Sequence, residues 1–401
     1  MAVVAPIAAS ERVALVDVLR GFALLGILVV NTGVFKSAGF GPAADAPPLD
    51  QLASGAILLL FTLKFYVLFS FLFGYGFSVQ MARAAERGAP WVPRYLRRLL
   101  GLLLLGVAHA VLLYVGDILV TYAVLGVALL AFRRARSRVL VGVAIGLVAL
   151  SALGVAGVGA VVSVLPASDT ADVAREVEVD AARTEAAYRG SPGEVVEERL
   201  RTWPAVLVFA LLGQGPTVLG MFLLGLWAGR RRLLERIDEH RPLLRRALVL
   251  GLVVGLPGSA AFAAATVASG FDFDATFFLA SAVDFATAPF LTAGYVSGIA
   301  LLHARPAGAR RLAVLAPVGR MALSNYLLQS LVCSLVFTGY GLGLFGRVGA
   351  AAGLVVSFAI FAAQVPLSAW WLRRFRFGPA EWLLRSFTYA RRQPLRSDPA
   401  A

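Results

Sequence analysis

Side chains that can do chemistry are rare within the apolar stretches of this 401-residue chain, so each one is informative. His109 is the one histidine of three inside such a stretch, and an imidazole can take up or release a proton near neutral pH. Lys64 reaches a similar depth, while Asn31 and Asp117 come near the outer ends of their stretches. From depth alone, we expect Asn31, Lys64, His109 and Asp117 to border one polar cavity and to carry catalysis or relay protons. The simpler alternative makes His109 a hydrogen-bonded packing residue.

A second set of polar residues lies toward the inner ends of the stretches. Asp17 and Arg20 are three residues apart, which places them one helical turn apart on the same side. Arg320 reaches a similar depth in a later stretch, so Asp17 is its expected partner, because a lone charge in hydrocarbon is costly. Asn31 shares the face of Arg20 at the outer end. This stripe indicates a binding site or, more simply, a surface ion pair with a packing amide.

Further polar residues extend this inner set. Gln214 lies near mid-depth and precedes Gly215-Pro216, where a helix is expected to break against protein or a cavity. No histidine or cysteine spacing matches a metal motif, so no metal is expected, and the single cysteine, Cys333, excludes a disulfide within the chain. The candidate binding residues are Asp17, Arg20, Arg97, Arg98, Gln214, Arg320 and Asn325.

The composition requires membrane helices to position these residues. Apolar residues make up 59% of the chain and charged residues 15%, which is too few to cover the surface of a soluble globular protein. A crossing helix needs about 20 mostly apolar residues. We therefore expect an all-α polytopic bundle of about ten spans, with the third and fourth divided at Val115-Gly116-Asp117 because Gly-Asp favours a turn. The expected spans are 14–35, 54–81, 99–116, 117–133, 139–165, 204–229, 247–269, 281–303, 312–337 and 348–372.

Arginine-rich loops alternate with loops poor in arginine, and this alternation orients the chain. The positive-inside rule places the basic loops and both termini in the cytoplasm. A membrane surface accounts for the net charge of +14, so nucleic acid is not an expected partner. We expect Ala43 and Thr184 outside, and Ala89, Glu239 and Asp398 inside.

Two polar segments lie outside the spans. Residues 166–203 form an acidic external loop, expected to be a solvated connector, in which Ser191-Pro192-Gly193-Glu194 predicts a helix start with a capping box. After Gly378-Pro379, an amphipathic pattern predicts an interfacial helix, better suited to anchoring than to binding. The expected parts of the chain are 1–138 with four spans, 139–229 with spans five and six, and 230–401 with four spans and the tail helix.

Five stretches of the chain match a known pattern. They are residues 16–31 (VDVLRGFALLGILVVN), 65–76 (FYVLFSFLFGYG), 116–119 (GDIL), 319–326 (GRMALSNY) and 378–385 (GPAEWLLR). They resemble the YeiB family of bacterial inner-membrane proteins, whose C-terminal part is a domain of unknown function. The resemblance extends over nearly the whole chain and implies a multi-pass protein of the bacterial inner membrane.

The opening stretch also resembles transmembrane acyltransferases of the heparan N-acetyltransferase and sugar O-acyltransferase type. That resemblance implies transfer of an acyl group from cytoplasmic acyl-CoA to a small-molecule or glycan acceptor outside, with the CoA phosphates at the arginine-lined inner mouth. Acyl-CoA would be a donor substrate, and no permanently bound cofactor is implied. The sugar enzymes commonly carry a histidine where this chain has Asn31, and residues 32–82 contain none, so His109 would have to take that role.

Two other functions remain open. In a transporter or exporter, Lys64, His109 and Asp117 would relay protons or a small molecule. In a non-catalytic envelope protein, the same residues would only pack. A homodimer also stays open, since no pattern in the chain indicates an oligomeric state.

Overall fold

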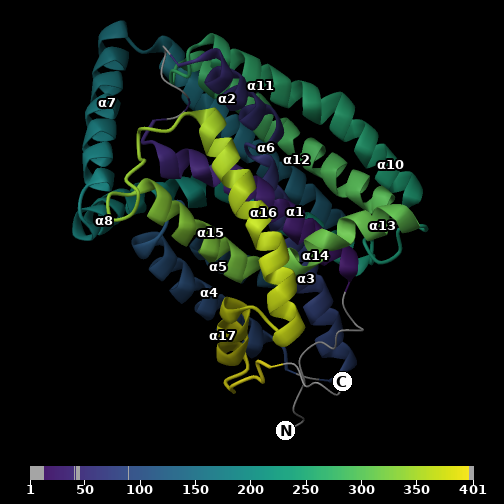
Figure 1. Cartoon of the computed structure of the whole chain (residues 1–401). Helices are drawn as coiled ribbons and strands as arrows, with labels where there is room; N and C mark the ends of the chain where they lie inside the picture. Colours follow the sequence, from purple (N-terminus) through teal and green to yellow (C-terminus); the bar gives the residue numbers. More distant parts are fainter. Residues whose placement is uncertain (1–12, 40, 42–45, 89, 397–401) are drawn as a thin grey trace.

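The computed structural model describes residues 13–39, 41, 46–88 and 90–396. Within these residues the regular structure is helical, and the extended pairing is limited to an isolated bridge between Phe375 and Arg396. Figure 1 shows the helices packed side by side in one bundle. The expected all-α polytopic bundle is therefore confirmed. Ala43, Ala89 and Asp398, whose sides of the membrane the sequence predicts, lie outside the described residues.

Ten apolar segments of the described chain correspond to the expected spans: eight are long enough to cross a membrane, and two are shorter helices. The long ones are α1 (Ala14–Lys36), α2 with α3 (Pro48–Leu60, Lys64–Glu86), α4 (Val92–Leu112), α6 (Ser137–Val164), α8 with η2 and α9 (Pro192–Val208, Phe209–Gln214, Gly215–Arg230), α10 with η3 and α11 (Arg241–Leu250, Gly251–Gly255, Leu256–Ala268), α12 (Ala275–His303) and α16 (Ala350–Arg374). The shorter ones are α5 (Leu119–Ala131) and α15 (Ala322–Phe337). The other helices are α7 (Ala167–Arg189), α13 (Pro306–Leu312), η4 (Ala313–Leu315), α14 (Ala316–Arg320) and α17 (Pro379–Thr388).

Two helix boundaries lie where local signals predict them. α4 ends at Leu112 and α5 begins at Leu119, and the Asp117 carboxylate accepts the Val120 backbone N–H at 2.9 Å, which caps the first turn of α5. At the start of α8, the Ser191 hydroxyl accepts the Glu194 N–H while the Glu194 carboxylate accepts the Ser191 N–H. The predicted turn and the predicted capping box are both confirmed.

The second span contains a break that the sequence does not signal. α2 and α3 are separated by three residues, and Leu63 adopts φ 64°, a left-handed conformation that is uncommon for leucine. A helix end leaves backbone carbonyls without partners. Here Lys64 Nζ donates to the Leu58 carbonyl, and the Tyr295 hydroxyl donates to the Leu60 carbonyl, each at 3.0 Å. Side chains from the bundle therefore provide hydrogen-bond donors for the free carbonyls at the end of α2.

The expected break at Gly215-Pro216 is wrong. The chain continues as one helix from α8 through the π-helical segment η2 into α9. Proline lacks an N–H and clashes with the preceding turn, and the wider π register accommodates both effects. Gln214 is the last residue of this segment and is half-buried.

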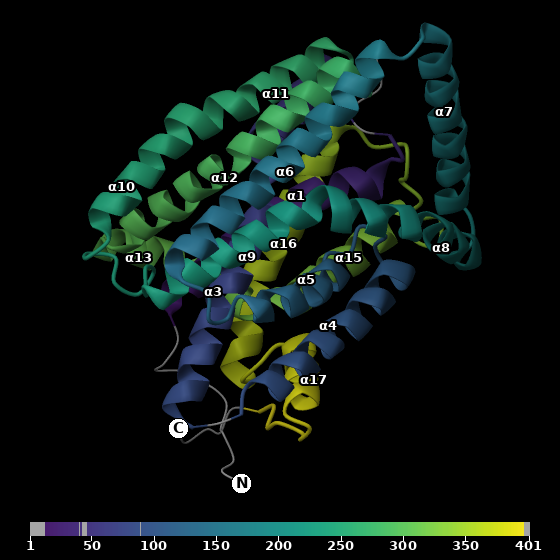
Figure 2. The ribbon, with the colours of Figure 1, turned by 180° about the vertical axis from the view of Figure 1, so that it is seen from behind.

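Helix packing joins segments that are far apart in the chain. α3 lies along α9 at glycine contacts, since a Cβ on Gly225 would lie 2.0 Å from the Phe71 carbonyl oxygen. α1 packs against α3, α14, α15 and α16. Seen from behind in Figure 2, α6 packs between α9 and α12. Helices from all three expected parts of the chain thus share one bundle.

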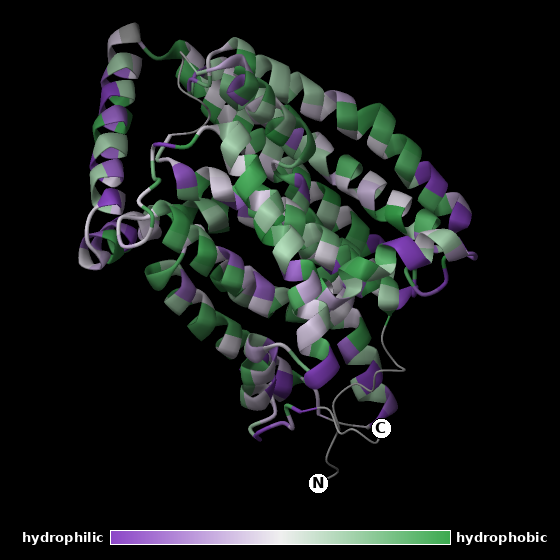
Figure 3. Ribbon diagram, in the orientation of Figure 1, coloured by the Kyte–Doolittle hydropathy of each residue, from purple (hydrophilic) through white to green (hydrophobic). Residues whose placement is uncertain are grey.

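The arginine-rich connections gather at one end of the bundle. The start of α10 and α13 lie on the right of Figure 1 and the end of α3 lies toward the lower right, whereas α2 and α7 lie toward the upper left. Figure 3 shows hydrophilic residues on the right and at the bottom of the molecule and along α7, with apolar residues over the middle of the bundle. We name the arginine-rich end the inner end, because the positive-inside rule predicts that it faces the cytoplasm.

Candidate functional site

A cavity of about 430 Å³ extends into the bundle from its inner end. Its walls come from α1, α3, α4, α5, α14, α15 and α17. Along α1 the lining residues run from Val16 to Ile27, which corresponds to about 16 Å at the rise of an α-helix. The lining carboxylates are Asp17 and Glu381. The lining arginines are Arg20, Arg83, Arg87, Arg94, Arg98, Arg320 and Arg385. The wall is therefore strongly cationic.

Asp17 and Arg20 form the ion pair that their spacing predicts. Arg20 Nη1 lies 3.3 Å from Asp17 Oδ1, and both side chains face the cavity. The guanidinium is about a third exposed, whereas the carboxylate is largely buried. One of the lining arginines is thus already neutralised.

Arg320 lies in the same cavity wall, but its partner differs from the expected one. The backbone of α14 presses on α1 there, since a Cβ on Gly319 would clash with the Asp17 carbonyl oxygen. Among the described residues, Asp17 forms its ion pair with Arg20, and the buried Nε of Arg320 has no hydrogen-bond partner. The expected Asp17–Arg320 pair is therefore corrected: the α1 helix places Arg20 nearer to the carboxylate. Arg320 keeps donor capacity at the cavity wall.

The second lining carboxylate is committed to structure. Glu381 on α17 accepts the backbone N–H groups of Leu323 and Ser324, at 2.7 and 3.1 Å, and the Ser324 hydroxyl at 2.5 Å. These donors lie at the N-terminus of α15, where a negative charge is favourable. Burial raises the pKa of Glu381, and its hydrogen bonds oppose that shift. Glu381 therefore fastens the tail helix to the bundle.

The tail helix also contributes to the cavity, which the sequence did not predict. α17 is amphipathic as expected, with Leu383 and Phe387 exposed. Its other side places Leu384 and Arg385 in the cavity wall, and the buried Nη1 of Arg385 has no hydrogen-bond partner among the described residues. α17 packs against α4 and α15, and its role as an anchor rather than a binding element stays a prediction.

His109 and Asp117 come together as a buried pair. His109 Nδ1 lies 2.7 Å from Asp117 Oδ2, and the two side chains are 1% and 0% exposed. The other carboxylate oxygen accepts the Val120 N–H, so the carboxylate has a fixed orientation. The Nε2 atom of His109 is buried and has no hydrogen-bond partner within the described chain. A carboxylate that orients an imidazole and leaves its second nitrogen open is the arrangement of a general base.

Tyr326 connects this pair to the cavity. Its side chain belongs to the cavity lining, and its ring centroid lies 4.8 Å from that of His109. Its hydroxyl is buried and, within the described residues, lacks a hydrogen-bond partner. Ile118 and Leu119, directly after Asp117, line the cavity as well. The deep end of the cavity is therefore one side chain away from His109.

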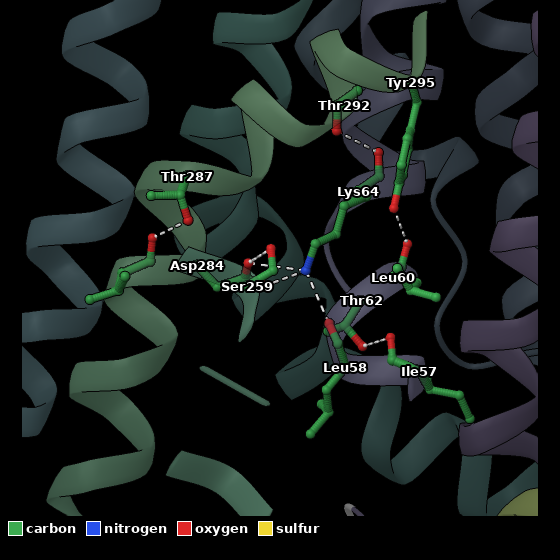
Figure 4. Close-up of polar contacts among 11 residues, drawn as sticks. Ile57, Leu58, Leu60, Thr62, Lys64, Ser259, Asp284, Thr287, Thr292 and Tyr295 are labelled. Atoms are coloured by element: carbon green, nitrogen blue, oxygen red, sulfur yellow. Dashed lines mark hydrogen bonds and ion pairs between the residues drawn. The ribbon is translucent and has the colours of Figure 1, made fainter. Parts of the chain in front are cut away.

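Lys64 lies in a different place. Its Nζ lies 3.0 and 2.9 Å from the two carboxylate oxygens of Asp284 on α12, and both side chains are fully buried (Figure 4). Ser259 on α11 donates to the same carboxylate at 2.7 Å. The expectation that Lys64 shares one cavity with the histidine pair is wrong. Depth along a helix does not fix which side of the helix a residue occupies, and Lys64 faces α11 and α12.

The remaining candidates lie outside the cavity lining. Asn31 is half-buried beyond the deep end, and Arg97 is exposed one residue before the lining residue Arg98. Asn325 is buried between α15 and α16, where its Nδ2 donates to Ser368 Oγ at 3.0 Å. Gln214 in η2 also lies outside the cavity lining, so a binding role for these residues stays a prediction.

Comparison with known proteins assigns the chain to a family. It is 34% identical to "Uncharacterized protein YxaH" of Bacillus subtilis, with 97% of each chain covered. It is 31% identical to "Uncharacterized protein YeiB" of Escherichia coli, with 94% of this chain and 96% of that one covered. The chain belongs to the YeiB family. The profile described as "Protein of unknown function (DUF418)" matches residues 228–391, and no solved structure matches.

The family assignment covers both ends of the site. The matched region 228–391 holds Arg320, Tyr326, Glu381 and Arg385, while the YeiB relatives align along nearly the full chain and so also include the His109–Asp117 segment. The family assignment confirms the first expected resemblance. The resemblance to acyltransferases remains a prediction, since the names of these relatives state no activity.

Arg199 is a buried residue that sequence reasoning missed in this YeiB-family protein. Within the segment 166–203, α7 is largely exposed, as expected for a solvated connector. In contrast, α8 places Arg199 inside the bundle, where it is 1% exposed. Arg199 donates to the Leu112 carbonyl at the C-terminus of α4 and to Ser334 Oγ. A cation is favourable at that helix end. Its burial could have been predicted from its position: Arg199 lies two turns after the Ser191 cap, in a helix that continues into the apolar span of η2 and α9.

Proposed function

We propose that this protein is a transmembrane acyltransferase of the bacterial inner membrane. It would take an acyl group from cytoplasmic acyl-CoA and transfer it to a small-molecule or glycan acceptor on the other side. One observation carries the proposal: Tyr326 lines the arginine-rich cavity, and its ring contacts His109 of the Asp117–His109 pair. An anion-binding entrance and a buried base are thus parts of one site.

The inner end has the chemistry of a phosphate site. Guanidinium groups bind phosphate oxygens through paired, charge-assisted hydrogen bonds. Arg98, Arg320 and Arg385 line the cavity together, while Asp17 pairs with Arg20 and Glu381 with the start of α15. This excess of positive charge favours a ligand with several negative charges. The phosphates of acyl-CoA fit that requirement.

The deeper part of the cavity suits the remainder of the donor. Its lining is mainly apolar and aromatic, as is usual for small-molecule sites. The lining residues of this part are Leu24, Ile27, Phe69, Leu72, Phe73, Leu102, Ile118, Leu119, Tyr122 and Tyr326. A pantetheine arm with its acyl thioester would run along this wall toward His109.

Acyl transfer needs one base at the deep end. His109 Nε2 takes the proton from the acceptor O–H or N–H while the acceptor oxygen or nitrogen attacks the thioester carbonyl carbon. The new C–O or C–N bond forms, the C–S bond breaks with its electron pair on sulfur, and the sulfur receives the proton from the imidazolium. Asp117 accepts the Nδ1–H and stabilises the charged imidazole. Because Tyr326 covers His109, its side chain has to turn aside when the donor binds.

Reconstitution tests this proposal. The purified protein is placed in proteoliposomes with labelled acetyl-CoA on the arginine-rich side and candidate amino- or hydroxyl-bearing sugars on the other. We expect protein-dependent loss of acetyl-CoA and label in the acceptor, with neither in protein-free liposomes. Binding of acetyl-CoA without turnover across a broad acceptor panel would contradict the proposal.

A second observation favours the transporter alternative. Lys64 and Asp284 form a fully buried ion pair, and ionisable groups at such depth often mark ion or substrate routes. No residue of this pair lines the cavity. Proton-driven uptake or efflux in the same proteoliposomes, lost in Asp284→Asn, would support transport over acyl transfer.

A further inference from the structure

An aromatic side chain stands at the inner mouth of the cavity, among its arginines. Trp91 lies just before α4, lines the cavity and is half-buried. Arg94 and Arg98 follow it on the first two turns of α4, and both line the same cavity. A wide flat ring therefore lies directly beside cationic groups at the entrance.

The indole is held in a fixed position. Its ring stacks on Tyr95 with centroids 4.9 Å apart and an interplanar angle of 18°, and it meets the edge of Phe77 at 4.8 Å. Tyr95 is itself anchored, since its hydroxyl donates to the Gly126 carbonyl at 3.0 Å. Phe77 is buried. Tyr95 thus supports one face of the Trp91 ring, and Trp91 is among the residues that line the cavity.

We infer that Trp91 stacks on the base of a nucleotide whose phosphates bind Arg94 and Arg98. A fixed aromatic ring gives a base a platform that costs little conformational entropy, and arginines close by supply the phosphate contacts. This inference rests on the proposed function, and it names the part of the donor that the mouth recognises: an adenine nucleotide bearing the acyl carrier arm. Phosphate groups alone, whether inorganic or on a lipid, would use the arginines and leave the indole unused.

Binding measurements on the purified full-length protein test this inference. The probes are 3′-phospho-ADP, which carries base and phosphates, and inorganic pyrophosphate, which carries phosphates alone. We expect 3′-phospho-ADP to bind at least about tenfold more tightly than pyrophosphate, the order expected for one stacked base. Trp91→Ala should remove that difference without weakening pyrophosphate, and Trp91→Phe should keep most of it.

A matched control comes from the same end of the molecule. Trp370 is exposed, lies outside the cavity lining and also has an arginine over its ring, with Arg374 Cζ 4.6 Å from the centroid. Trp370→Ala should leave both affinities unchanged. Equal affinity for the two probes, or equal weakening of both by Trp91→Ala, would overturn the inference. Displacement of 3′-phospho-ADP and pyrophosphate to the same extent by phosphatidylglycerol would assign the mouth to a lipid headgroup and overturn it as well.

The outcome separates this inference from the proposed function. If nucleotide binding depends on Trp91 but no acyl group is transferred, the nucleotide site stands and the acyltransferase proposal fails. If acyl transfer proceeds equally well from acyl-phosphopantetheine, which lacks the nucleotide, and Trp91→Ala has no effect, the transfer function stands and the base platform fails.

Discussion

Lys64 and Asp284 are the clearest case of buried charges that neutralise each other in this protein. The lysine meets both carboxylate oxygens and the Leu58 carbonyl, and Ser259 completes the cluster. The same lysine therefore closes the end of α2 and neutralises a carboxylate on α12. Removal of one partner would leave the other charge alone in a medium that cannot solvate it.

This pair predicts a non-additive effect on stability. Lys64→Met or Asp284→Leu alone should lower the free energy of unfolding by about 3–5 kcal/mol, because each leaves one buried ion unpaired. The double variant should recover most of that loss. Unfolding in mixed detergent, followed by helical circular dichroism, measures all three. Losses that simply add in the double variant would show that the pair is not coupled.

The sequence predicted only part of the grouping of these polar residues. It predicted that His109 and Asp117 share a site, and the eight-residue spacing across a Gly-Asp turn brings them together. It failed for Lys64, since the direction of a side chain around a helix follows from tertiary packing. It also missed Tyr326 as the link, because a tyrosine in an apolar stretch looks like an ordinary core residue.

Asp117 gives a second prediction at this scale. Asp117→Asn keeps an acceptor for the Val120 N–H but removes the charge that stabilises the imidazolium. We expect the rate of acyl transfer to fall by about a hundredfold or more, with acyl-CoA binding retained. Steady-state kinetics and equilibrium binding measure the two quantities. An unchanged rate would remove Asp117 from the mechanism.

Helices place the site residues through contacts that only the folded bundle makes. α17 is the best example, since the amphipathic pattern predicted a helix on the membrane surface, and the structure docks it under α15 through Glu381. The Gly-Asp turn and the Ser191 cap were predictable because their hydrogen bonds are local. The break before α3 and the π segment before α9 were not, because partners on distant helices decide them.

The docking of α17 can be tested directly. Glu381→Ala removes the acceptor of two N–H groups at the start of α15, so it should destabilise the docked tail by about 1–2 kcal/mol. Amide hydrogen exchange over residues 379–388 should rise. Glu381→Gln retains an acceptor and should show a smaller rise. Equal protection in the wild type and Glu381→Ala would show that apolar contacts alone hold the helix.

The whole molecule is polarised between its two ends. Basic connections collect around the cavity mouth, while the acidic α7 stands at the opposite side (Figure 3). This distribution is what the positive-inside rule requires of a chain with its cavity open to the cytoplasm. The direction of acyl transfer in our proposal follows from that orientation.

Cysteine labelling tests the orientation. The native Cys333 is fully buried, so Cys333→Ser gives a silent background. In intact cells an impermeant maleimide should label Thr184→Cys on α7, and it should label Glu239→Cys between α9 and α10 only after permeabilisation. The reverse pattern would invert the membrane orientation and place the arginine-lined mouth outside, away from acyl-CoA.

The central claim is that the cavity and His109 form one catalytic site. His109→Gln in proteoliposomes loaded with labelled acetyl-CoA tests it most directly, since glutamine keeps a polar side chain and cannot act as the base. The account predicts that this variant binds acetyl-CoA like the wild type and transfers no label to the acceptor. Transfer at the wild-type rate by His109→Gln would contradict the account, because the described chain offers no other histidine at this cavity.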